Sequence, residues 1–509
     1  MSQRKLAPMR LNDESIRLLR EAARIGSGSI FLVGGAIRDI LLQRPWVDLD
    51  LACRRPEALS RRLASAFGGK FVTLDAKEGV YRVALPASFR QVRRLDVARL
   101  QGPGILQDLA RRDFTVNALA VEISSKQPAT LEPSKVIDPR GGLRDIKGRL
   151  LRAESADLFE SDPLRLLRAF RFASQLGFNI EAGTLKHIRR CRSLARKPTG
   201  ERIQAELGLL LGNPGASEWL KRMDECSLLT ALLPELEPER ACATVYYGSG
   251  GVLRHSLDTA SRADFLFHNL SKVFPDHASA LSAELERPFG AATRKSVLML
   301  GALLHDIAKP ATARKVGGRL RFFGHDQLGA RQAAELLREL RFPGEVVDTL
   351  STVIAHHLRP GNLAASGMIT DKAAYRFFRD LGPRALDLLL VCWADHASYL
   401  PHPVLLKHLG RARLEPQGPE GRSLSRIKPV EARKTIYHLQ VVSHLLKKLL
   451  APGPGPLPRP IVNGHEVMKA LKLQPGPRIG QLLEKVREAQ ALGEVKTKKQ
   501  ALELLREHR

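Results

Sequence analysis

The sequence predicts an α+β fold that begins with a small mixed sheet and continues almost entirely in helices. Short β-rich runs alternate with helices up to about residue 150, whereas apolar residues recur at helical spacing from residue 151 onward. The 509 residues suffice for about three domains of ~150 residues each. Stretches rich in Pro, Gly and charge at 413–431 and 451–460 interrupt the helical part and predict a linker and a second break.

These changes of pattern divide the chain into five segments. We expect a head over residues 1–150, a helical neck over 151–240, a second helical domain over 241–412, a linker with one helix over 413–460, and a small helical module over 461–509. In the head, the strand-like runs are SIFLV (29–33), VDLDLAC (47–53) and VRRLDVARL (92–100), and a helix is expected for AIRDILLQ. The head therefore mixes both element types, and the rest is helical.

The charge balance indicates a polyanionic partner. Lys and Arg number 81 and Asp and Glu 53, which gives a net charge of +28. So large an excess favours nucleic acid over an anionic membrane surface, with a generally basic proteome as the plain alternative. The five cysteines are scattered with no CxxC pair, which excludes a Cys-based zinc ribbon and fits a reducing compartment.

Membrane insertion and secretion are not expected. The basic start MSQRKLAPMR is followed by no apolar segment of the kind that a secretory signal needs. The longest apolar runs, around Val297–Leu304 and Leu388–Trp393, are too short to cross a bilayer. We therefore expect a soluble, cytoplasmic protein.

A glycine turn and paired carboxylates form the first constellation. Gly34 and Gly35 follow a strand, so the backbone can approach a bound group and a helix start faces phosphates. Asp48 and Asp50 are two residues apart on a strand and share a face, and Asp96 on the third run is placed to complete the set. Converging carboxylates bind divalent cations for phosphoryl or nucleotidyl transfer, although a DxD alone also fits a solvated strand edge.

Four motifs in order carry a family resemblance. GGAIRD with DLD is followed by RRDFTVNA (111–118), DPRGG (138–142) and DPLRLLRAFRF (162–172). In this order they resemble the class II tRNA nucleotidyltransferases and bacterial poly(A) polymerases, whose heads are polymerase-β-like. The likeness covers about residues 25–240. It implies a nucleotidyltransferase head and a neck, over 151–240, that binds RNA and selects the base.

The resemblance also assigns roles to residues of this chain. It implies that Asp48 and Asp50 carry two Mg²⁺ ions and that Asp96 is a third catalytic carboxylate. Nucleotide binding is implied for two sets: the triphosphate cradle of Gly34, Gly35, Arg38 and Asp39, and the ribose and triphosphate contacts Asp108, Arg111, Arg112 and Asn117. Glu201, Arg202 and Glu206 match a last motif that braces the base-selecting helix.

Base selection is expected from one helix. Asp162 and Arg165 are three residues apart and share a helix face, so an acceptor and a donor can meet a base edge; the plain alternative is an intrahelical ion pair. The resemblance implies that this pair selects CTP and ATP, with Arg168 and Arg171 continuing the nucleotide-binding face. The family often has Glu-Asp here, so Ser161 predicts a loss of support.

Histidines and aspartates form a second constellation in the 241–412 segment. His255, His305, Asp306 and Asp395 suit a divalent metal ion, whose identity the sequence leaves open. Their contexts RHSLDTA, LLHDIAKP, GHDQLGA, VIAHHL and WADHAS resemble the HD phosphohydrolase domain that some CCA-adding enzymes carry. His325 and His356 are additional ligands if the site holds two ions. A degenerate, purely structural HD fold is the alternative.

Several functions remain open. The leading one is addition of CMP and AMP to the tRNA 3′ end from CTP and ATP. The short segment VARLQGPGILQDLA between Asp96 and the RRDFT motif also fits an enzyme that adds only C or only A. A poly(A) polymerase shares every head motif, and an HD phosphohydrolase with an inactive head is the remaining alternative. The basic module over 461–509 is expected to contact tRNA, although its lysines also fit a solvated helix face.

Overall fold

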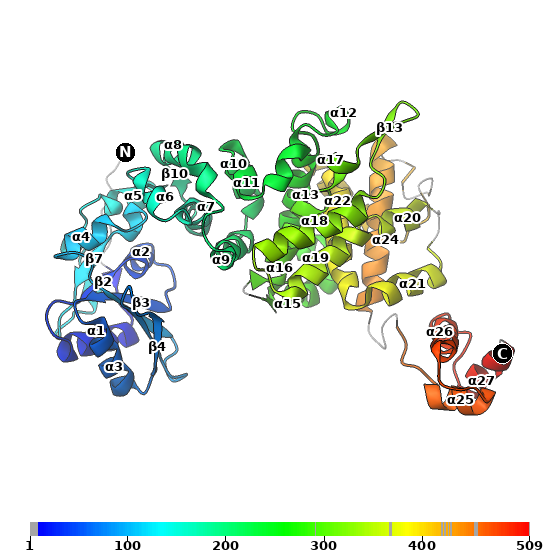
Figure 1. Ribbon diagram of the computed structural model, residues 1–509, viewed down its shortest axis with the longest axis horizontal. Helices are drawn as coiled ribbons and strands as arrows, with labels where there is room; N and C mark the ends of the chain where they lie inside the picture. Colours follow the sequence, from blue (N-terminus) through cyan, green and yellow to red (C-terminus); the bar gives the residue numbers. More distant parts are fainter. Residues whose placement is uncertain are drawn as a thin grey trace. The chain divides into compact units, whose positions relative to one another are not determined.

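The computed structural model describes residues 9–290, 292–365, 369–418, 421, 424–425, 427, 430–451 and 457–507. The chain divides into two compact units, one comprising residues 1–198 with 226–228 and the other the remainder (Figure 1). The border at 198–199 lies inside the segment expected to form the neck. The five segment boundaries therefore stay a prediction.

A six-stranded mixed sheet forms the centre of the first unit. Its strand order is β4-β5-β6-β3-β2-β7, with β3 and β6 parallel and the other neighbours antiparallel. The strands are β2 (Phe31–Val33), β3 (Asp48–Cys53), β4 (Lys70–Asp75), β5 (Val80–Ala84), β6 (Arg94–Arg99) and β7 (Ala120–Glu122). This sheet confirms the predicted small mixed sheet.

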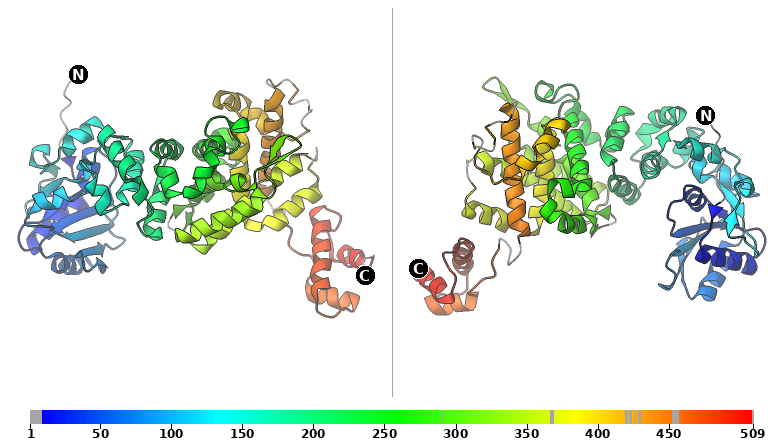
Figure 2. Two further views of the ribbon diagram at one scale, coloured as in Figure 1. Left: turned by 45° about the horizontal axis from the view of Figure 1, so that its top comes forward. Right: turned by 180° about the vertical axis from the view of Figure 1, so that it is seen from behind.

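Helices cover this sheet in the first unit (Figure 2). α3 packs on β5 and β6, and α1 packs on α3. The helices are α1 (Asp13–Ile25), α2 (Gly35–Leu41), α3 (Pro56–Phe67), α4 (Ile105–Ala110), α5 (Gly142–Gly148), α6 (Asp157–Ser161), α7 (Arg165–Leu176) and α8 (Ala182–Cys191), with short 3-10 helices η1 (Thr115–Asn117), η2 (Pro133–Lys135) and η3 (Arg192–Leu194). Two further strand pairs are β1 (Met9–Arg10) with β8 (Thr130–Leu131), and β9 (Leu150–Leu151) with β10 (Asn179–Ile180).

The second unit is built of helices, as predicted. Its elements up to residue 412 are α9 (Gly200–Leu211), α10 (Ala216–Glu225), α11 (Leu228–Leu232), η4 (Pro234–Arg240), α12 (Thr244–Tyr247), α13 (Gly251–His268), α14 (Leu270–Val273), η5 (Pro275–His277), α15 (Ala278–Glu286), β11 (Pro288–Phe289), β12 (Ala292–Thr293), α16 (Arg294–Leu304), α17 (Lys309–Thr312), β13 (Arg314–Val316), β14 (Arg319–Arg321), α18 (His325–Glu339), α19 (Gly344–His356), α20 (Arg359–Ala365), α21 (Asp371–Leu381), η6 (Gly382–Arg384), α22 (Ala385–Ser398) and α23 (His402–Ala412).

The core of this helical unit lies around α22. Helices α13 and α16 pack on α22 and on each other, and α19 packs on α16, α18 and α22. α22 is buried almost all round, and Trp393 is among the largest fully buried side chains. A helix that is apolar on every side belongs in a protein interior or a membrane. Among the described helices, none is long and apolar enough to cross a membrane.

The C-terminal part contains one long helix and a small separate core. α24 (Val430–Leu450) packs on α20, α22 and α23, and parts of the predicted linker and break lie outside the described residues. The module consists of α25 (Gly464–Leu471), α26 (Pro477–Ala491) and α27 (Lys498–Glu507). Val467, Val486 and Leu505 belong to its hydrophobic cluster. A capping box between Asn463 and Glu466 begins α25.

Two candidate catalytic sites

The three predicted carboxylates of the head meet on two neighbouring strands. Asp48 and Asp50 lie on β3, and Asp50 is paired in register with Asp96 of β6, so the two side chains leave the sheet next to each other. Burial, together with the negative charges of Asp96 and Asp48, raises the pKa of Asp50 to about 6. Three carboxylates this close repel one another, and a cation between them would relieve that repulsion.

Two arginines pair with these carboxylates. Arg82 of β5 donates from Nε and Nη2 to the two oxygens of Asp96, both at 2.7 Å, and Arg94 of β6 donates to Asp48 at 2.6 Å. The second oxygen of Asp48 is buried and accepts no hydrogen bond. Carboxylate oxygens on one face, one of them unpaired, fit the oxygen ligation that Mg²⁺ prefers. Sequence reasoning missed Arg82 because its strand was not predicted.

The glycine turn brings the backbone close to this site. Gly34 has φ +73°, a conformation that L side chains rarely adopt, and its N–H donates to Leu119 O at 3.0 Å. A Cβ on Gly34 would lie 3.1 Å from Arg112 Nη1 and 3.8 Å from Asp50 Oδ2. Only glycine therefore satisfies both the turn and the close approach of a ligand to the carboxylates.

A buried polar chain connects the motifs of the head. Arg38 donates to Asn117 and to Asp39, Asn117 donates to Asp113 at 3.1 Å, and Arg168 donates to Asp113 at 3.0 and 2.6 Å. Burial acts to raise the pKa of Asp113, but the charge of Arg168 and the hydrogen bonds from Arg168, Asn117 and the Phe114 N–H together lower it. Asp113 was not predicted as a site residue, although it stands inside the RRDFTVNA motif. It fixes two predicted nucleotide contacts, Asn117 and Arg168.

One cleft of about 830 Å³ contains nearly all of the predicted head residues. Asp96 is not among its lining residues and stands beside Asp50 in the sheet. The predicted residues that line it are Gly34, Gly35, Arg38, Asp39, Asp48, Asp50, Asp108, Arg111, Arg112, Asn117, Asp162, Arg165, Arg168 and Arg171. With Arg99, seven arginines line the cleft together with the carboxylates Asp48 and Asp50, and this charge pattern suits a triphosphate with its metal ion. Phe172, which Arg171 stacks on at 3.9 Å, is an unpredicted lining residue.

Asp162 and Arg165 do not share one helix, which corrects our expectation. α7 begins at Arg165, and Asp162 has an extended backbone because the residue before a proline disfavours the α conformation. Arg165 donates to Leu158 O and Arg111 O, both at 3.0 Å, and to Ser161 Oγ at 3.3 Å. Ser161 thus contacts Arg165, and the loss of support relative to the Glu that the family often has here stays a prediction. Both residues still line the cleft.

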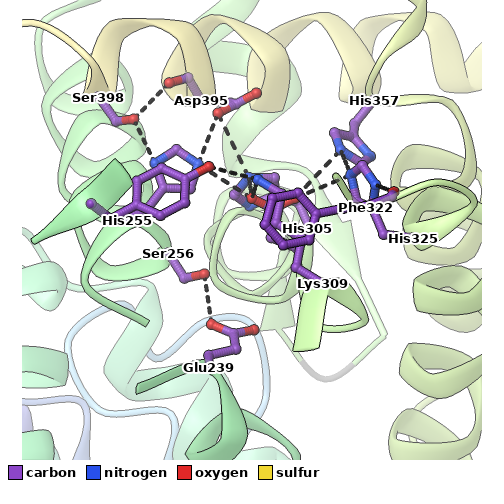
Figure 3. A network of polar contacts seen from close by, with 12 residues as sticks. Glu239, His255, Ser256, His305, Lys309, Phe322, His325, His357, Asp395 and Ser398 are labelled. Carbon is purple, nitrogen blue, oxygen red and sulfur yellow. Dashed lines mark hydrogen bonds and ion pairs between the residues drawn. The ribbon is translucent and has the colours of Figure 1, made fainter. Parts of the chain in front are cut away.

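The four predicted ligands of the helical unit converge in its interior. His255 comes from α13, His305 and Asp306 follow α16, and Asp395 lies on α22 (Figure 3). His255 Nε2 lies 3.2 Å from Asp395 Oδ1, and His305 Nε2 lies 3.2 Å from Asp306 Oδ2. One ligand atom from each of His255, His305 and Asp395 falls within 4.8 Å of the others, as a metal site requires.

A second group of potential ligands shares Asp306. Asp306, His325 and His357 offer ligand atoms within 4.8 Å of one another, and the Nε2 atoms of the two histidines are 3.2 Å apart (Figure 3). Asp306 turns Oδ2 toward His255 and Oδ1 toward His325. The sequence analysis expected His356, whereas His357 is the residue in the group. Consecutive residues at a helix end point about 100° apart, so only one of the pair can face the site.

Backbone carbonyls orient three of these histidines. Nδ1 of His305, His325 and His357 lies 2.9, 2.6 and 2.7 Å from a carbonyl oxygen three residues earlier. A carbonyl only accepts, so each Nδ1 donates and each Nε2 keeps its lone pair for the centre. Burial lowers the pKa of His357 to about 4, so that ring is neutral.

Among the described residues, four buried ligand atoms of this group have no hydrogen-bond partner, which also favours metal binding. The atoms His255 Nε2, His305 Nε2, Asp306 Oδ1 and Asp395 Oδ1 are buried and make no hydrogen bond in the described structure. Lone pairs buried without a partner are costly unless a cation takes them up. This donor set fits divalent metal ions, which the two groups of ligands would hold, with one oxygen of Asp306 facing each group. We refer to the six residues as the HD centre: His255, His305, Asp306, His325, His357 and Asp395.

Three further side chains near the HD centre were missed by sequence reasoning: Lys309, Tyr247 and Glu239. Lys309 Nζ forms an ion pair with Asp306 and donates to the Tyr247 hydroxyl at 2.8 Å. The Tyr247 ring stacks on His255 with a centroid distance of 4.8 Å. Lys309 stands in the LLHDIAKP motif, which was the available signal.

Glu239 is a fully buried acid near the HD centre. It accepts a hydrogen bond from Ser256 Oγ at 2.9 Å, and burial raises the pKa of Glu239 to about 8.

Comparisons with protein families match four parts of the chain. Residues 30–152 match the poly A polymerase head domain, 177–240 the probable RNA and SrmB-binding site of polymerase A, 252–400 the HD domain, and 458–505 the putative domain 2 of tRNA nucleotidyltransferases. The second match contains Glu201, Arg202 and Glu206 of the neck but not the motif at 162–172, and the third contains all six residues of the HD centre.

Several relatives match over nearly their whole length. The chain is 33% identical over 480 residues to an A-adding tRNA nucleotidyltransferase of Deinococcus radiodurans, covering 92% of this chain and 93% of that protein. It is 34% identical to a CC-adding tRNA nucleotidyltransferase of Thermus thermophilus, covering 92% of each. Among solved structures, the Thermotoga maritima CCA-adding enzyme complexed with tRNA matches 98% of this chain and 96% of that chain, with a TM-score of 0.61 and 18% identity. This last likeness supports the fold.

Proposed function

Because the chain belongs to the family of tRNA nucleotidyltransferases, we propose that it transfers CMP and AMP from CTP and ATP to the 3′ end of tRNA. The observation that carries the proposal is the set of three carboxylates, Asp48, Asp50 and Asp96, on two adjacent strands beside an arginine-lined cleft. The net charge of +28 suits the RNA substrate. We place this reaction in the cytoplasm, where tRNA and both nucleotides are present.

The proposed reaction joins the terminal ribose oxygen to the α-phosphorus. The bond between the α-phosphorus and its bridging oxygen to the β-phosphate breaks, and pyrophosphate leaves. Asp48, Asp50 and Asp96 would hold Mg²⁺, which supplies neutralisation of phosphate charge and a lower proton affinity at the attacking hydroxyl. Arg38, Arg111 and the other arginines of the cleft would bind the triphosphate that Gly34 lets approach.

Base selection is proposed for Asp162 and Arg165. Both line the cleft, and they differ in what holds them: Arg165 is fixed by carbonyl acceptors, whereas Asp162 ends α6 in an extended conformation. A fixed guanidinium donor and a carboxylate acceptor can meet a base edge with complementary hydrogen bonds. The proposal places the choice of CTP and ATP on this pair, as our expectation from sequence did.

A partial reaction is the second candidate. The relatives that match more than nine-tenths of this chain include one A-adding and two CC-adding enzymes. The short segment between β6 and Arg111, which contains α4, also favours an enzyme that adds only part of CCA. Multifunctional CCA proteins match a smaller share of the chain, such as 75% for that of Paracidovorax citrulli.

An extension assay tests both candidates. Purified protein with Mg²⁺ is given tRNA transcripts that end before CCA, after C or after CC, each with CTP, ATP or both. Two C residues followed by one A would support full CCA addition, and C alone or A alone would support the partial reaction. A long A ladder, or no addition to any transcript, would contradict the proposal. UTP and GTP serve as controls for base selection.

For the HD centre we propose metal-dependent hydrolysis of phosphate esters. Its six ligands would hold two divalent ions whose identity a metal analysis must establish; such ions supply a hydroxide and bind the phosphate. Lys309, beside Asp306, is placed to neutralise charge on the phosphate oxygens. Loss of phosphatase activity in His305→Ala, with nucleotide addition retained, is the expected result. Equal loss of both activities would contradict separate sites.

A further inference from the structure

A small hairpin beside the HD centre carries an unusual charge pattern. β13 and β14 contain four exposed cations, Arg314, Lys315, Arg319 and Arg321, within eight residues. Arg314 and Arg321 are direct cross-strand partners, and Arg319 lies on the same face as Arg321 because it is two residues away. In the described part of the chain, none of the four forms an ion pair with an acidic side chain. Like charges placed opposite each other in a hairpin are destabilising.

Two exposed aromatic side chains flank this hairpin. Tyr246 is 51% exposed and Phe323 is 70% exposed. The Tyr246 hydroxyl donates to Leu320 O and accepts from Leu320 N, both at 3.1 Å, which ties α12 to the hairpin. Exposed aromatic rings next to cations are the features that hold unstacked bases and phosphates of single-stranded nucleic acid.

The chain neighbours of these two aromatic residues contact ligands of the HD centre. Tyr247, next to Tyr246, stacks on His255 at 4.8 Å. Phe322, next to Phe323, has its ring centroid 6.5 Å from that of His325 and 5.6 Å from Lys309 Nζ (Figure 3). In each of these two pairs of consecutive residues, one ring contacts the HD centre and the other is exposed to solvent. A strand bound on the outer rings would therefore lie next to Tyr247 and Phe322, the two rings that contact the HD centre and Lys309.

We propose that this surface binds a single strand of RNA whose terminal phosphate ester enters the HD centre. We call it the hairpin surface, defined by Arg314, Lys315, Arg319, Arg321, Tyr246 and Phe323. The proposal rests on the phosphohydrolase activity proposed above and narrows its substrate class from small phosphate esters to the ends of RNA strands. Lys309 and the metal ligands suffice for one phosphate group, whereas four further cations match the several phosphates of a polynucleotide.

A crosslinking experiment tests the surface without relying on hydrolysis. The probe is an RNA octamer that ends in a 3′-phosphate, which prevents extension, and carries 4-thiouridine at the penultimate position. After irradiation of the full-length protein with Mn²⁺, crosslinked peptides are mapped by mass spectrometry. We expect crosslinks to residues 244–247 and 314–323. An excess of unlabelled octamer should suppress these crosslinks, whereas an excess of RNA duplex should not. Crosslinks confined to residues 30–240 and 458–507, or equal suppression by polyglutamate, would overturn the proposal.

A kinetic experiment tests the role of the cations. The double variant Lys315→Glu/Arg319→Glu is compared with a matched charge reversal, Lys272→Glu/Arg338→Glu, at exposed positions outside the hairpin surface. The readout is the ratio of kcat/KM for the octamer to that for p-nitrophenyl phosphate. We expect a fall of about tenfold or more in the hairpin variant, with a salt slope smaller by about 1.4, since each lost phosphate contact removes about 0.7. The control variant should keep the wild-type ratio, and a similar fall there would overturn the assignment.

A second variant keeps the test independent of charge. Phe323→Ala removes a stacking ring and leaves the net charge unchanged. We expect the ratio of kcat/KM for the octamer to that for p-nitrophenyl phosphate to fall about fivefold to tenfold, within the range measured for base–aromatic stacking. An unchanged ratio in both hairpin variants would overturn the proposal. If the wild-type protein hydrolyses neither substrate, the proposed phosphohydrolase activity fails, and the crosslink map still decides the RNA-binding surface.

Discussion

The two candidate sites both gather carboxylates, but they balance the negative charge in different ways. In the head, Asp48 and Asp96 are paired with arginines of the same sheet, and the pair of Arg94 and Asp48 is 43% and 32% exposed. In the HD centre, His305 and Asp306 are each 1% exposed, and several ligand atoms have no hydrogen bond. From this difference we expect the head to take up an ion that arrives with the nucleotide, and the HD centre to hold resident ions.

The largest effect expected from this difference is on metal content. After dialysis against EDTA and removal of the chelator, we expect the HD centre to retain two ions per chain and the head none, measured by mass spectrometry of the eluted metals. Asp306→Asn should lower the content to less than one ion, because Asp306 contacts both ligand groups. His357→Ala should lose one ion of the two.

His356→Ala is the matched control for this measurement. His356 precedes His357 but does not belong to the ligand group. An unchanged content of two ions in His356→Ala, beside one ion in His357→Ala, would sharpen the assignment. Equal loss of metal in both variants would contradict the choice of His357 as the ligand. Wild-type protein that holds no tightly bound ion would contradict the claim that the HD centre, unlike the head, holds its ions permanently.

The ion pairs of the head predict a smaller effect on metal binding, and here a substitution should strengthen the binding of metal instead of weakening it. Arg82 occupies both oxygens of Asp96, so a metal ion must compete with it. We expect Arg82→Ala to bind Mn²⁺ about threefold to tenfold more tightly, as measured by electron paramagnetic resonance, because the carboxylates lose a competing cation. Arg90→Ala, an exposed arginine elsewhere in the head, is the control. Weaker metal binding in Arg82→Ala would show that this arginine orients Asp96 instead.

The smallest effect concerns the acid buried below the HD centre. The folded-state pKa of Glu239 is about 8, above its ordinary value of 4.5, so the folded state holds a proton that the unfolded state releases above pH 4.5. The stability that neutral Glu239 contributes is therefore full below pH 4.5 and is lost as pH rises toward 8. In metal-free protein, Glu239→Gln should raise the Tm of the second unit by about 2–4 °C more at pH 8 than at pH 5. A difference independent of pH would contradict a buried neutral acid.

Much of the head could be predicted because its motifs combine several constraints. Gly34 is required by a turn with positive φ, and Asp48 and Asp50 share one face of β3 because they are two residues apart. Both rules are local, so the sequence alone could place these residues in one site. β4 and β5 escaped prediction because β4 is an exposed edge strand without alternating burial, and Arg82 was missed with them. The break of the helix before Arg165 follows from Pro163, whose effect on Asp162 is a local rule that the helical pattern concealed.

The HD centre shows where sequence reasoning ends. The four candidate ligands His255, His305, Asp306 and Asp395 were predicted from local contexts, although the first and last are 140 residues apart in the sequence. The choice of His357 over His356 depends on the rotation of α19 within its unit, and that rotation is set by tertiary packing. Lys309 of α17 and Tyr247 of α12 are 62 residues apart in the chain, so their contact depends on tertiary packing that no local pattern encodes.

Separate catalysis by the two sites is the central claim, and one paired measurement tests it most directly. Asp50→Asn and His305→Ala are each assayed for nucleotide addition to tRNA and for phosphatase activity at saturating metal. We predict that Asp50→Asn loses at least about a thousandfold in addition, a loss of more than ~4 kcal/mol of transition-state stabilisation, and keeps its phosphatase activity. His305→Ala should show the reverse. Loss of both activities in either variant, with the fold intact by circular dichroism, would contradict the claim.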